Sequence, residues 1–145
     1  MTTQTTALHQ RIHDSFVRQG MMQHLGARLV SVTPGEVELA LPYSERVTQQ
    51  QGGYHGGAMG ALADIAAGYA GLTVAEDGKE VATVEYKINF LAAFSGGELR
   101  ARGHVVRAGK RLIITRAEVV HLDDDGGESP CALMQQTLAV VNKTY

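Results

Sequence analysis

Residues 52–76 constrain the fold most strongly, because a glycine-rich turn there runs directly into a long helical stretch rich in alanine and glycine. Asp64 is the only charged side chain between Arg46 and Glu76. Burying a carboxylate in such an apolar surface without a partner disfavours its charged form. We therefore expect Asp64 to take part in catalysis. The alternative is that it lies on the helix surface and pairs with an arginine.

The start of this helix predicts the other half of a site. If the helix begins near Gly56, the backbone N–H groups of Gly56 and Gly57 are expected to be unpaired donors at the positive end of the helix dipole, where they suit an oxyanion. Asp64 lies eight residues further on, about 12 Å along the axis, so one carbonyl group cannot contact both ends from the same helix. A second copy running antiparallel across a two-fold axis brings Asp64 of one chain near Gly56 of the other. We expect a composite site in a homodimer.

Length and composition limit the class of protein. The chain of 145 residues, 44% of them hydrophobic, is long enough for one domain with its own core. A net charge of −2 gives no argument for a nucleic acid or an anionic membrane as partner. The single cysteine, Cys131, excludes an internal disulfide and a cysteine metal cluster, and suits a cytoplasmic location. The N-terminus lacks the apolar core of a signal peptide, and the glycines and Asp64 argue against a membrane span over residues 56–75.

Hydrophobic periodicity and turn residues predict the order of elements. A short amphipathic helix over residues 5–22 precedes a hairpin over residues 26–41, and then comes the long helix, whose core-facing stripe is expected to be Met59, Leu62, Tyr69 and Leu72. Four further strands are predicted over residues 81–94, 98–107, 111–122 and 130–142. The predicted fold is α+β, with a largely antiparallel sheet of about six strands that curls round the long helix.

The HGG at residues 55–57, the acid nine residues after His55 in HGGAMGALAD, and the order of elements resemble the hotdog fold. In particular they resemble its acyl-CoA thioesterases of the phenylacetate-degradation (PaaI-like) type, over about residues 26–141. The resemblance implies one hotdog domain over residues 1–145, with an N-terminal helix over 1–24 and the hotdog core over 26–142. It also implies a homodimer or a dimer of dimers, the latter a homotetramer.

Carried over by position, the resemblance implies that the Gly56 amide polarises the thioester carbonyl and that Asp64 is the nucleophile or general base. Gln49, seven residues before the glycine, is implied to contact substrate or water. Thr83 is implied to supply the hydroxyl that assists the water. Strand alternation places Thr83 on the polar side with Glu85, so it has to reach the site near a subunit boundary or through a β-bulge.

Two further groups of residues are expected near the substrate. His55 and Gly57 border it, and His55 either fixes the turn by hydrogen bonding or acts as acid or base. Six of the thirteen Lys and Arg residues lie within residues 100–116 with no acid among them. In the resembled family the segment matching residues 107–114 lies by the pantetheine and phosphate end of CoA, which implies nucleotide contacts from Arg107, Gly109, Lys110 and Arg111. The alternative is a solvated strand face, and nucleic-acid binding has little support because no aromatic residues interleave with these cations.

The chemistry predicted for the site needs no metal, and no cofactor beyond the CoA that is part of the substrate. A thioester is already activated, so hydrolysis needs a dipole for the oxyanion and a carboxylate that attacks the carbonyl or takes a proton from water. The chain has no GxSxG motif, and Cys131 has no base beside it in sequence, which argues against a serine or cysteine hydrolase. The sequence predicts an acyl-CoA thioesterase that releases free CoA and a carboxylic acid of unspecified type. The alternatives are a hotdog hydratase or dehydratase acting on acyl-CoA or acyl carrier protein, with His55 as base, and a non-catalytic acyl-CoA binding module.

Overall fold

The computed structural model describes residues 3–145. Its helices are α1 (Thr3–Phe16), α2 (Gly20–Leu25) and α3 (Gly56–Leu72), with a single turn of 3-10 helix at Glu45–Val47. Its strands are β1 (Arg28–Thr33), β2 (Glu36–Pro42), β3 (Lys79–Phe90), β4 (Glu98–Ala108), β5 (Leu112–Leu122) and β6 (Glu128–Asn142). The predicted hairpin, long helix and four later strands are therefore confirmed, with shifts of a few residues at their ends.

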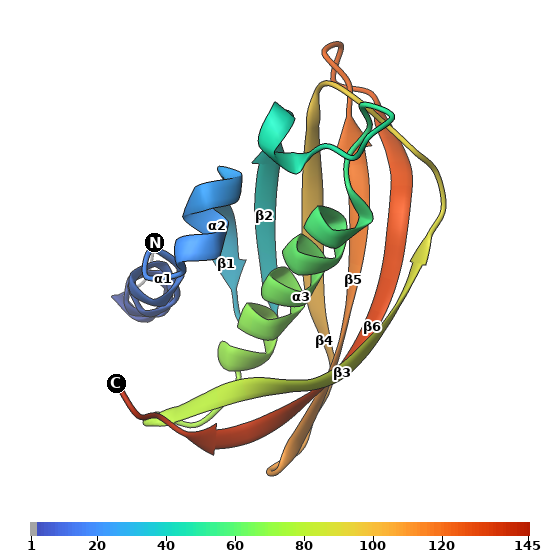
Figure 1. Cartoon of the computed structure of the whole chain (residues 1–145). Helices are drawn as coiled ribbons and strands as arrows, with labels where there is room; N and C mark the ends of the chain where they lie inside the picture. Colours follow the sequence, from blue (N-terminus) through green and yellow to red (C-terminus); the bar gives the residue numbers. More distant parts are fainter. Residues whose placement is uncertain (1–2) are drawn as a thin grey trace.

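The strands form one six-stranded sheet in the order β1-β2-β4-β5-β6-β3, and all neighbouring strands run antiparallel. This sheet curves round α3, so that β2, β4, β5 and β3 all contact the helix (Figure 1). The two edges of the sheet are β1 and β3. The architecture predicted from the sequence, a curved antiparallel sheet wrapped round a long central helix, is confirmed.

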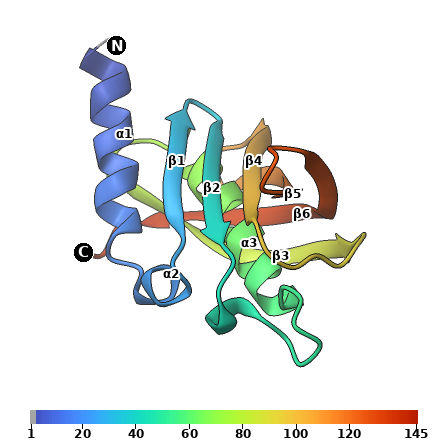
Figure 2. The same cartoon turned by 90° about the horizontal axis from the view of Figure 1, so that it is seen from above.

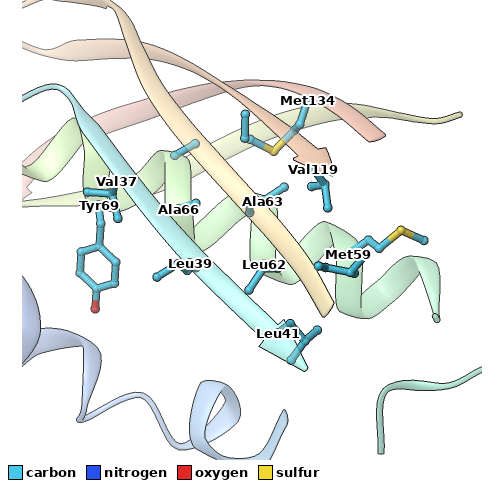
Figure 3. Close-up of a cluster of buried hydrophobic side chains, with 14 of the residues drawn as sticks. Val37, Leu39, Leu41, Met59, Leu62, Ala63, Ala66, Tyr69, Val119 and Met134 are labelled. Carbon is cyan, nitrogen blue, oxygen red and sulfur yellow. The ribbon is translucent and has the colours of Figure 1, made fainter. Parts of the chain in front are cut away.

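The core lies between α3 and the concave face of the sheet. The predicted stripe of Met59, Leu62, Tyr69 and Leu72 is buried, and it packs with residues of β2 and β5 such as Leu39, Leu41 and Val119 (Figure 3). Between these larger side chains the buried residues of α3 are mostly alanine and glycine. Small side chains let the helix backbone approach the sheet closely, which is the physical use of this unusual composition.

At Gly103 in β4 the backbones of the sheet and of α3 approach each other closely. A Cβ atom at this position would lie 2.4 Å from the backbone carbonyl of Ala66, which cannot move without shifting α3. We therefore expect Gly103→Ala to lower the free energy of unfolding by about 2 kcal/mol or more, as overpacking does in other cores. Urea denaturation measures this, with Gly20→Ala as control because a Cβ there meets no atom within 4 Å. Equal stability of the two variants would contradict the close packing.

The N-terminal segment differs from the prediction, because two helices replace the single helix expected over residues 5–22. Gln19 is extended, with φ −79° and ψ 98°, and separates α1 from α2. Ile12, Phe16 and Met22 are all buried. In one continuous helix Met22 would lie about 240° round the axis from Phe16, so the chain has to break for both to reach the core. The α1 helix runs beside the β1 edge of the sheet (Figure 2).

Candidate active site

Asp64 lies in the middle of α3 and is partly buried. Its Oδ1 atom accepts a hydrogen bond from Thr83 Oγ1 of β3 at 2.8 Å and another from Gln136 Nε2 of β6. Gln136 Nε2 also lies 3.3 Å from the Asp64 backbone oxygen and 3.3 Å from Thr83 Oγ1. Side chains of two adjacent strands therefore fix the position of the carboxylate.

Thr83 reaches Asp64 because β3 has a β-bulge. Thr83 pairs with Leu138 and Glu85 pairs with Thr137, so one extra residue, Val84, is inserted at this point. Leu138 is fully buried on the concave face, and Thr83 shares that face with it. The extra residue reverses the alternation, because side chains alternate strictly between faces only in a regular strand. The expected position of Thr83 on the polar side with Glu85 is thus wrong. Of the two routes expected to bring Thr83 to the site, a subunit boundary or a β-bulge, the structure shows the bulge.

Gln136 and Thr115 form part of the site that the sequence reasoning missed. Both side chains are buried, with 1% and 0% of their surfaces exposed, and Thr115 Oγ1 donates to Gln136 Oε1 at 2.8 Å. This hydrogen bond orients the Gln136 amide so that its N–H groups point to Asp64. The alternation of buried and exposed residues along β6 could have identified Gln136. It is the polar member of the buried series Ala132, Met134, Gln136 and Leu138.

A pocket of about 470 Å³ opens beside Asp64 and Thr83. It extends along α3 past Ile65 and Gly68 to Tyr69, and its other walls come from α1, the start of β3 and the C-terminal residue Tyr145. Within residues 3–145 no arginine, lysine or histidine forms an ion pair with Asp64. The carboxylate is therefore hydrogen-bonded on one oxygen but not neutralised by a cation.

The N-terminus of α3 holds a second group of predicted residues. His55 is the N-cap residue, and its Nδ1 accepts a hydrogen bond from the Gly57 N–H at 2.7 Å. The expectation that both glycine amides are unpaired is thus wrong for Gly57, whose donor is used by the cap. The Gly56 N–H has no hydrogen-bond partner in the described part of the chain. One amide therefore points out of the helix end with its donor free.

Gln49 lies in the loop that leads to this helix end. Its backbone N–H donates to the Gly53 carbonyl at 2.9 Å, and its side-chain Oε1 accepts from the Gln51 N–H at 2.5 Å. Both hydrogen bonds lie within the loop over residues 49–53 that precedes α3. The structure brings Asp64 and Thr83 together, but eight residues of helix, about 12 Å, separate them from Gly56 in the same chain.

The predicted basic cluster divides into two parts. Arg100 and Arg102 form ion pairs with Glu38 and Glu128 of other strands and with Glu98 of β4 itself. For these two arginines the structure therefore supports the solvated-face alternative. The hydrogen bond from Arg102 also holds the pKa of Glu128 below its usual value. Gly109, Lys110 and Arg111 instead line a separate pocket of about 600 Å³, together with Lys79.

This second pocket lies beyond the C-terminal end of α3, at the hairpin between β4 and β5. None of the residues that line it also lines the Asp64 pocket. Arg107 is exposed at a bulge in β4 just before the hairpin. The four residues predicted for the nucleotide thus lie on one hairpin, three of them around one pocket.

Residues 3–145 give little support to a cysteine nucleophile, a metal site or a membrane-spanning helix. Cys131 is buried, its Sγ lies 3.1 Å from Met59 Sδ, and burial raises the pKa of its thiol, which disfavours the nucleophilic thiolate. In that range no group of three or more His, Cys, Asp or Glu side chains is arranged to hold a metal ion. None of its helices combines the length and the hydropathy needed to cross a bilayer.

A curved antiparallel sheet wrapped round one long central helix is the hotdog class of fold. The thioesterase superfamily matches this chain over residues 51–128, which is more than half of its length. A solved structure of a thioesterase family protein from Silicibacter pomeroyi is 38% identical, with a TM-score of 0.90, and the match covers 94% of this chain and 99% of that one. The chain therefore belongs to the thioesterase superfamily and is a thioester hydrolase with the hotdog fold.

Two further relatives agree with this placement. The 1,4-dihydroxy-2-naphthoyl-CoA hydrolase of Listeria monocytogenes is 27% identical over 124 residues, which cover 86% of this chain and 98% of the relative. The Escherichia coli PaaI protein from the phenylacetic acid degradation operon has a TM-score of 0.84 at 22% identity, over 97% of each chain. At that identity the PaaI structure shows a shared fold.

Proposed function

We propose that the protein hydrolyses acyl-CoA thioesters to free CoA and a carboxylic acid, at a site composed of Asp64 from one subunit and the Gly56 N–H from its partner. The observation that carries the proposal is the Asp64 carboxylate, which borders a pocket, is held on one oxygen by Thr83 and Gln136, and has no ion pair in residues 3–145. A CoA thioester is also the substrate that the name of the Listeria relative gives.

The hydrogen bonds at Asp64 give its two carboxylate oxygens different roles in the reaction. Thr83 and Gln136 both donate to Oδ1, so Oδ2 is the atom that attacks the thioester carbon or takes a proton from water. The carbonyl oxygen gains negative charge in either route. The partner's helix end, with its free Gly56 amide and the positive end of the helix dipole, stabilises that charge. The C–S bond then breaks, and CoA leaves as the thiolate and takes up a proton. In the general-base route the water oxygen is by then bonded to the carbonyl carbon, so the acid forms directly. In the nucleophilic route the acyl group is left as an anhydride on Asp64, and a water molecule hydrolyses it to the acid and the free carboxylate.

The free edge of β3 supports the dimer that this site requires. Unpaired edge strands favour pairing with another chain, particularly where they are long and apolar. This edge is twelve residues long, and Val84 and Phe90 are 60% and 52% exposed. The Phe90 ring lies against Gly56, because a Cβ atom there would be 3.1 Å from Phe90 Cζ. Antiparallel pairing of two such edges places the two α3 helices side by side with opposite directions, in a homodimer or a dimer of dimers.

The remaining predicted residues have places in this scheme. His55 fixes the turn that presents the Gly56 amide, and Gln49 contacts the substrate or water at the same helix end. Lys110 and Arg111, with Arg107 and Gly109 beside them, contact the phosphates of CoA at the hairpin pocket. The scheme needs no metal or cofactor, and the buried thiol of Cys131 suits a reducing compartment such as the cytoplasm.

Release of free thiol from acyl-CoA tests the proposed activity. Aromatic and straight-chain acyl-CoAs are incubated with the native protein, free thiol is measured with a chromogenic disulfide, and the acid is measured by mass spectrometry. We expect equal amounts of thiol and acid. Hydration of an enoyl-CoA with the thioester intact would instead identify a hydratase. Binding of acyl-CoA with no product from any thioester would identify a binding module.

Gln136 is expected to act as a positioning residue for Asp64. Gln136→Leu removes the N–H donor to the carboxylate and leaves the buried Thr115 hydroxyl without its acceptor. We expect kcat to fall about 10-fold to 100-fold with little change in KM, since a hydrogen bond to a charged group contributes about 1.5–3 kcal/mol. The matched control is Gln135→Leu, whose side chain is exposed on the opposite face. A kcat for Gln136→Leu equal to that of the control would contradict this role.

A further inference from the structure

A buried histidine near the end of β5 has no part in the reaction described above. His121 is only 6% exposed. It continues the buried series of β5, which is Ile113, Thr115, Ala117 and Val119. A buried imidazole is costly unless its polar atoms are hydrogen-bonded. In residues 3–145 no carboxylate forms an ion pair with this ring, and its Nε2 atom lies 3.0 Å from the Gly96 carbonyl oxygen. The polar contact of His121 is therefore with a loop.

The hydrogen bond of His121 has one direction. A carbonyl oxygen only accepts, so the Nε2 atom carries the proton and donates it to Gly96. The imidazole ring also stacks on the Phe94 ring, with 4.5 Å between the ring centres and 5° between the planes. The Tyr54 ring meets the imidazole edge to face, with 6.2 Å between the ring centres. His121 therefore holds residues 94–96 both through its ring and through its proton.

Residues 94–97 lie in the loop between β3 and β4. Gly96 and Gly97 have φ values of 67° and 57°, in the left-handed region that favours glycine. Their carbonyl oxygens lie 3.1 Å and 3.2 Å from the Tyr54 hydroxyl. Burial raises the pKa of Tyr54, so the phenol keeps its proton and donates it. Since a backbone carbonyl has two lone pairs, Gly96 accepts from both His121 and Tyr54.

The same loop holds the turn that presents the Gly56 amide. Tyr54 precedes Gly56 by two residues, and its backbone N–H donates to the Phe94 carbonyl at 2.9 Å. A Cβ atom at Gly53 would lie 3.1 Å from that carbonyl oxygen, so the turn also packs closely on the loop. Both segments lie at the end of the sheet where α3 begins (Figure 1). Residues 94–97 thus fix the turn through the backbone and the side chain of Tyr54.

We propose that His121 is a positioning residue for the oxyanion donor, and that it acts on the Gly56 amide through residues 94–97 and Tyr54. This inference rests on the proposed function, because it takes that amide as the donor to the thioester oxygen. The hydrogen bond and the stacking of His121 go to the loop, so its effect on the amide is indirect. A displacement of about 1 Å at a catalytic group costs about 10²-fold in rate. A side chain that fixes the turn therefore controls the rate without contact with the reacting atoms.

His121→Phe and His121→Gln separate the role of the proton from that of the ring. Phenylalanine keeps an aromatic ring beside Phe94 but has no donor for Gly96, whereas glutamine keeps an N–H donor. We expect His121→Phe to lower kcat for thiol release about tenfold, the effect of roughly one net hydrogen bond. KM should stay within about twofold of native, because the amide binds charge that exists only as the reaction proceeds. His121→Gln should recover kcat to within about threefold of native, since the donor is restored.

A double-variant cycle with Gly56→Pro tests whether His121 acts through that amide. Thiol release is measured for the native protein, for each single variant and for the combined variant. Once the oxyanion donor is absent, His121 has nothing to position, so we expect His121→Phe to lower kcat less than about twofold in the Gly56→Pro background. Independent effects would instead multiply, and the further loss would be about tenfold. Tyr54→Phe, which removes the other donor to Gly96, is expected to give the same result in a second cycle.

Val32→Ala is the control for a loss of stability. Val32 is buried beside the start of β2, whose other end adjoins the loop before β4. The substitution removes packing without touching the turn, so we expect a lower urea midpoint and a native kcat. A low kcat in Val32→Ala would overturn the inference, because weaker packing anywhere in the sheet would then explain the effect of His121→Phe.

The outcomes separate this inference from the proposed function. A kcat loss in His121→Phe that disappears in the Gly56→Pro background supports the inference. A native kcat in His121→Phe, or a loss that multiplies with that of Gly56→Pro, would overturn it and leave the thioesterase activity in place. If His121→Phe does not fold, the Tyr54→Phe cycle decides between these results. A native kcat in Gly56→Pro, or no thiol release from any acyl-CoA, would overturn the proposed function itself.

Discussion

Asp64→Ala is expected to lower kcat for thiol release by about 10³-fold, because the variant has neither the nucleophile nor the general base of the proposed reaction. Binding of a non-hydrolysable CoA thioether is expected to change little, since the CoA portion contacts other residues. Stopped-flow thiol detection measures the first quantity and calorimetry the second. Asp64→Asn is expected to behave like Asp64→Ala, because an amide of the same shape still lacks a basic oxygen.

The control for these variants is Asp124→Ala, which removes an exposed acid from the turn between β5 and β6. Its kcat should equal that of the native protein. The urea midpoint of each variant shows whether a low rate reflects chemistry or unfolding. An Asp64→Ala protein that folds normally and turns over within about tenfold of the native rate would contradict the role of this carboxylate, because loss of the base alone costs more than that.

Gly56→Pro is expected to lower kcat by about 10²-fold to 10³-fold, as loss of one oxyanion donor does elsewhere. Proline has no N–H, yet it is well suited to the first position of a helix, and the extended ψ of 135° at His55 suits the residue before a proline. The substitution therefore removes the proposed donor and keeps the helix. KM should change much less than kcat, since the amide binds charge that exists only as the reaction proceeds.

Gly56→Ala is the matched control for this substitution. It adds a Cβ atom that meets the same Phe90 ring, but it retains the backbone N–H. We expect its kcat to stay within about threefold of native, because the oxyanion donor is unchanged and a ring at a strand edge can move. If alanine and proline at this position lower kcat equally, the packing of Phe90 and not the amide explains the loss.

Much of the fold follows from local patterns in the sequence. The long helix was predictable because a glycine-rich turn precedes a run of small residues, and the β1–β2 hairpin because Thr33, Pro34 and Gly35 form a turn between apolar strands. The break between α1 and α2 was not predictable in the same way. It depends on which residues reach the core, and that is a property of the tertiary structure and not of helix propensity.

The site was only partly predictable, for the same kind of reason. Asp64 is conspicuous as a lone charge, and its position on α3 could be expected. Thr83 was expected on the wrong face, because a β-bulge at Val84 is invisible to strict alternation. Gln136 and Thr115 lie 72 and 51 positions from Asp64, and only the pairing of β5 with β6 and the packing of α3 bring them to it.

The most direct test of the composite site is subunit complementation between two inactive variants. Asp64→Ala and Gly56→Pro chains are expressed together in equal amounts, and the purified mixture is assayed for thiol release. In a mixed dimer one site has both defects and the other has an intact Asp64 and an intact partner Gly56, so the mixture should recover about a quarter of native activity, given random pairing in a two-fold dimer. Activity no higher than that of the separate variants would contradict a site shared between subunits.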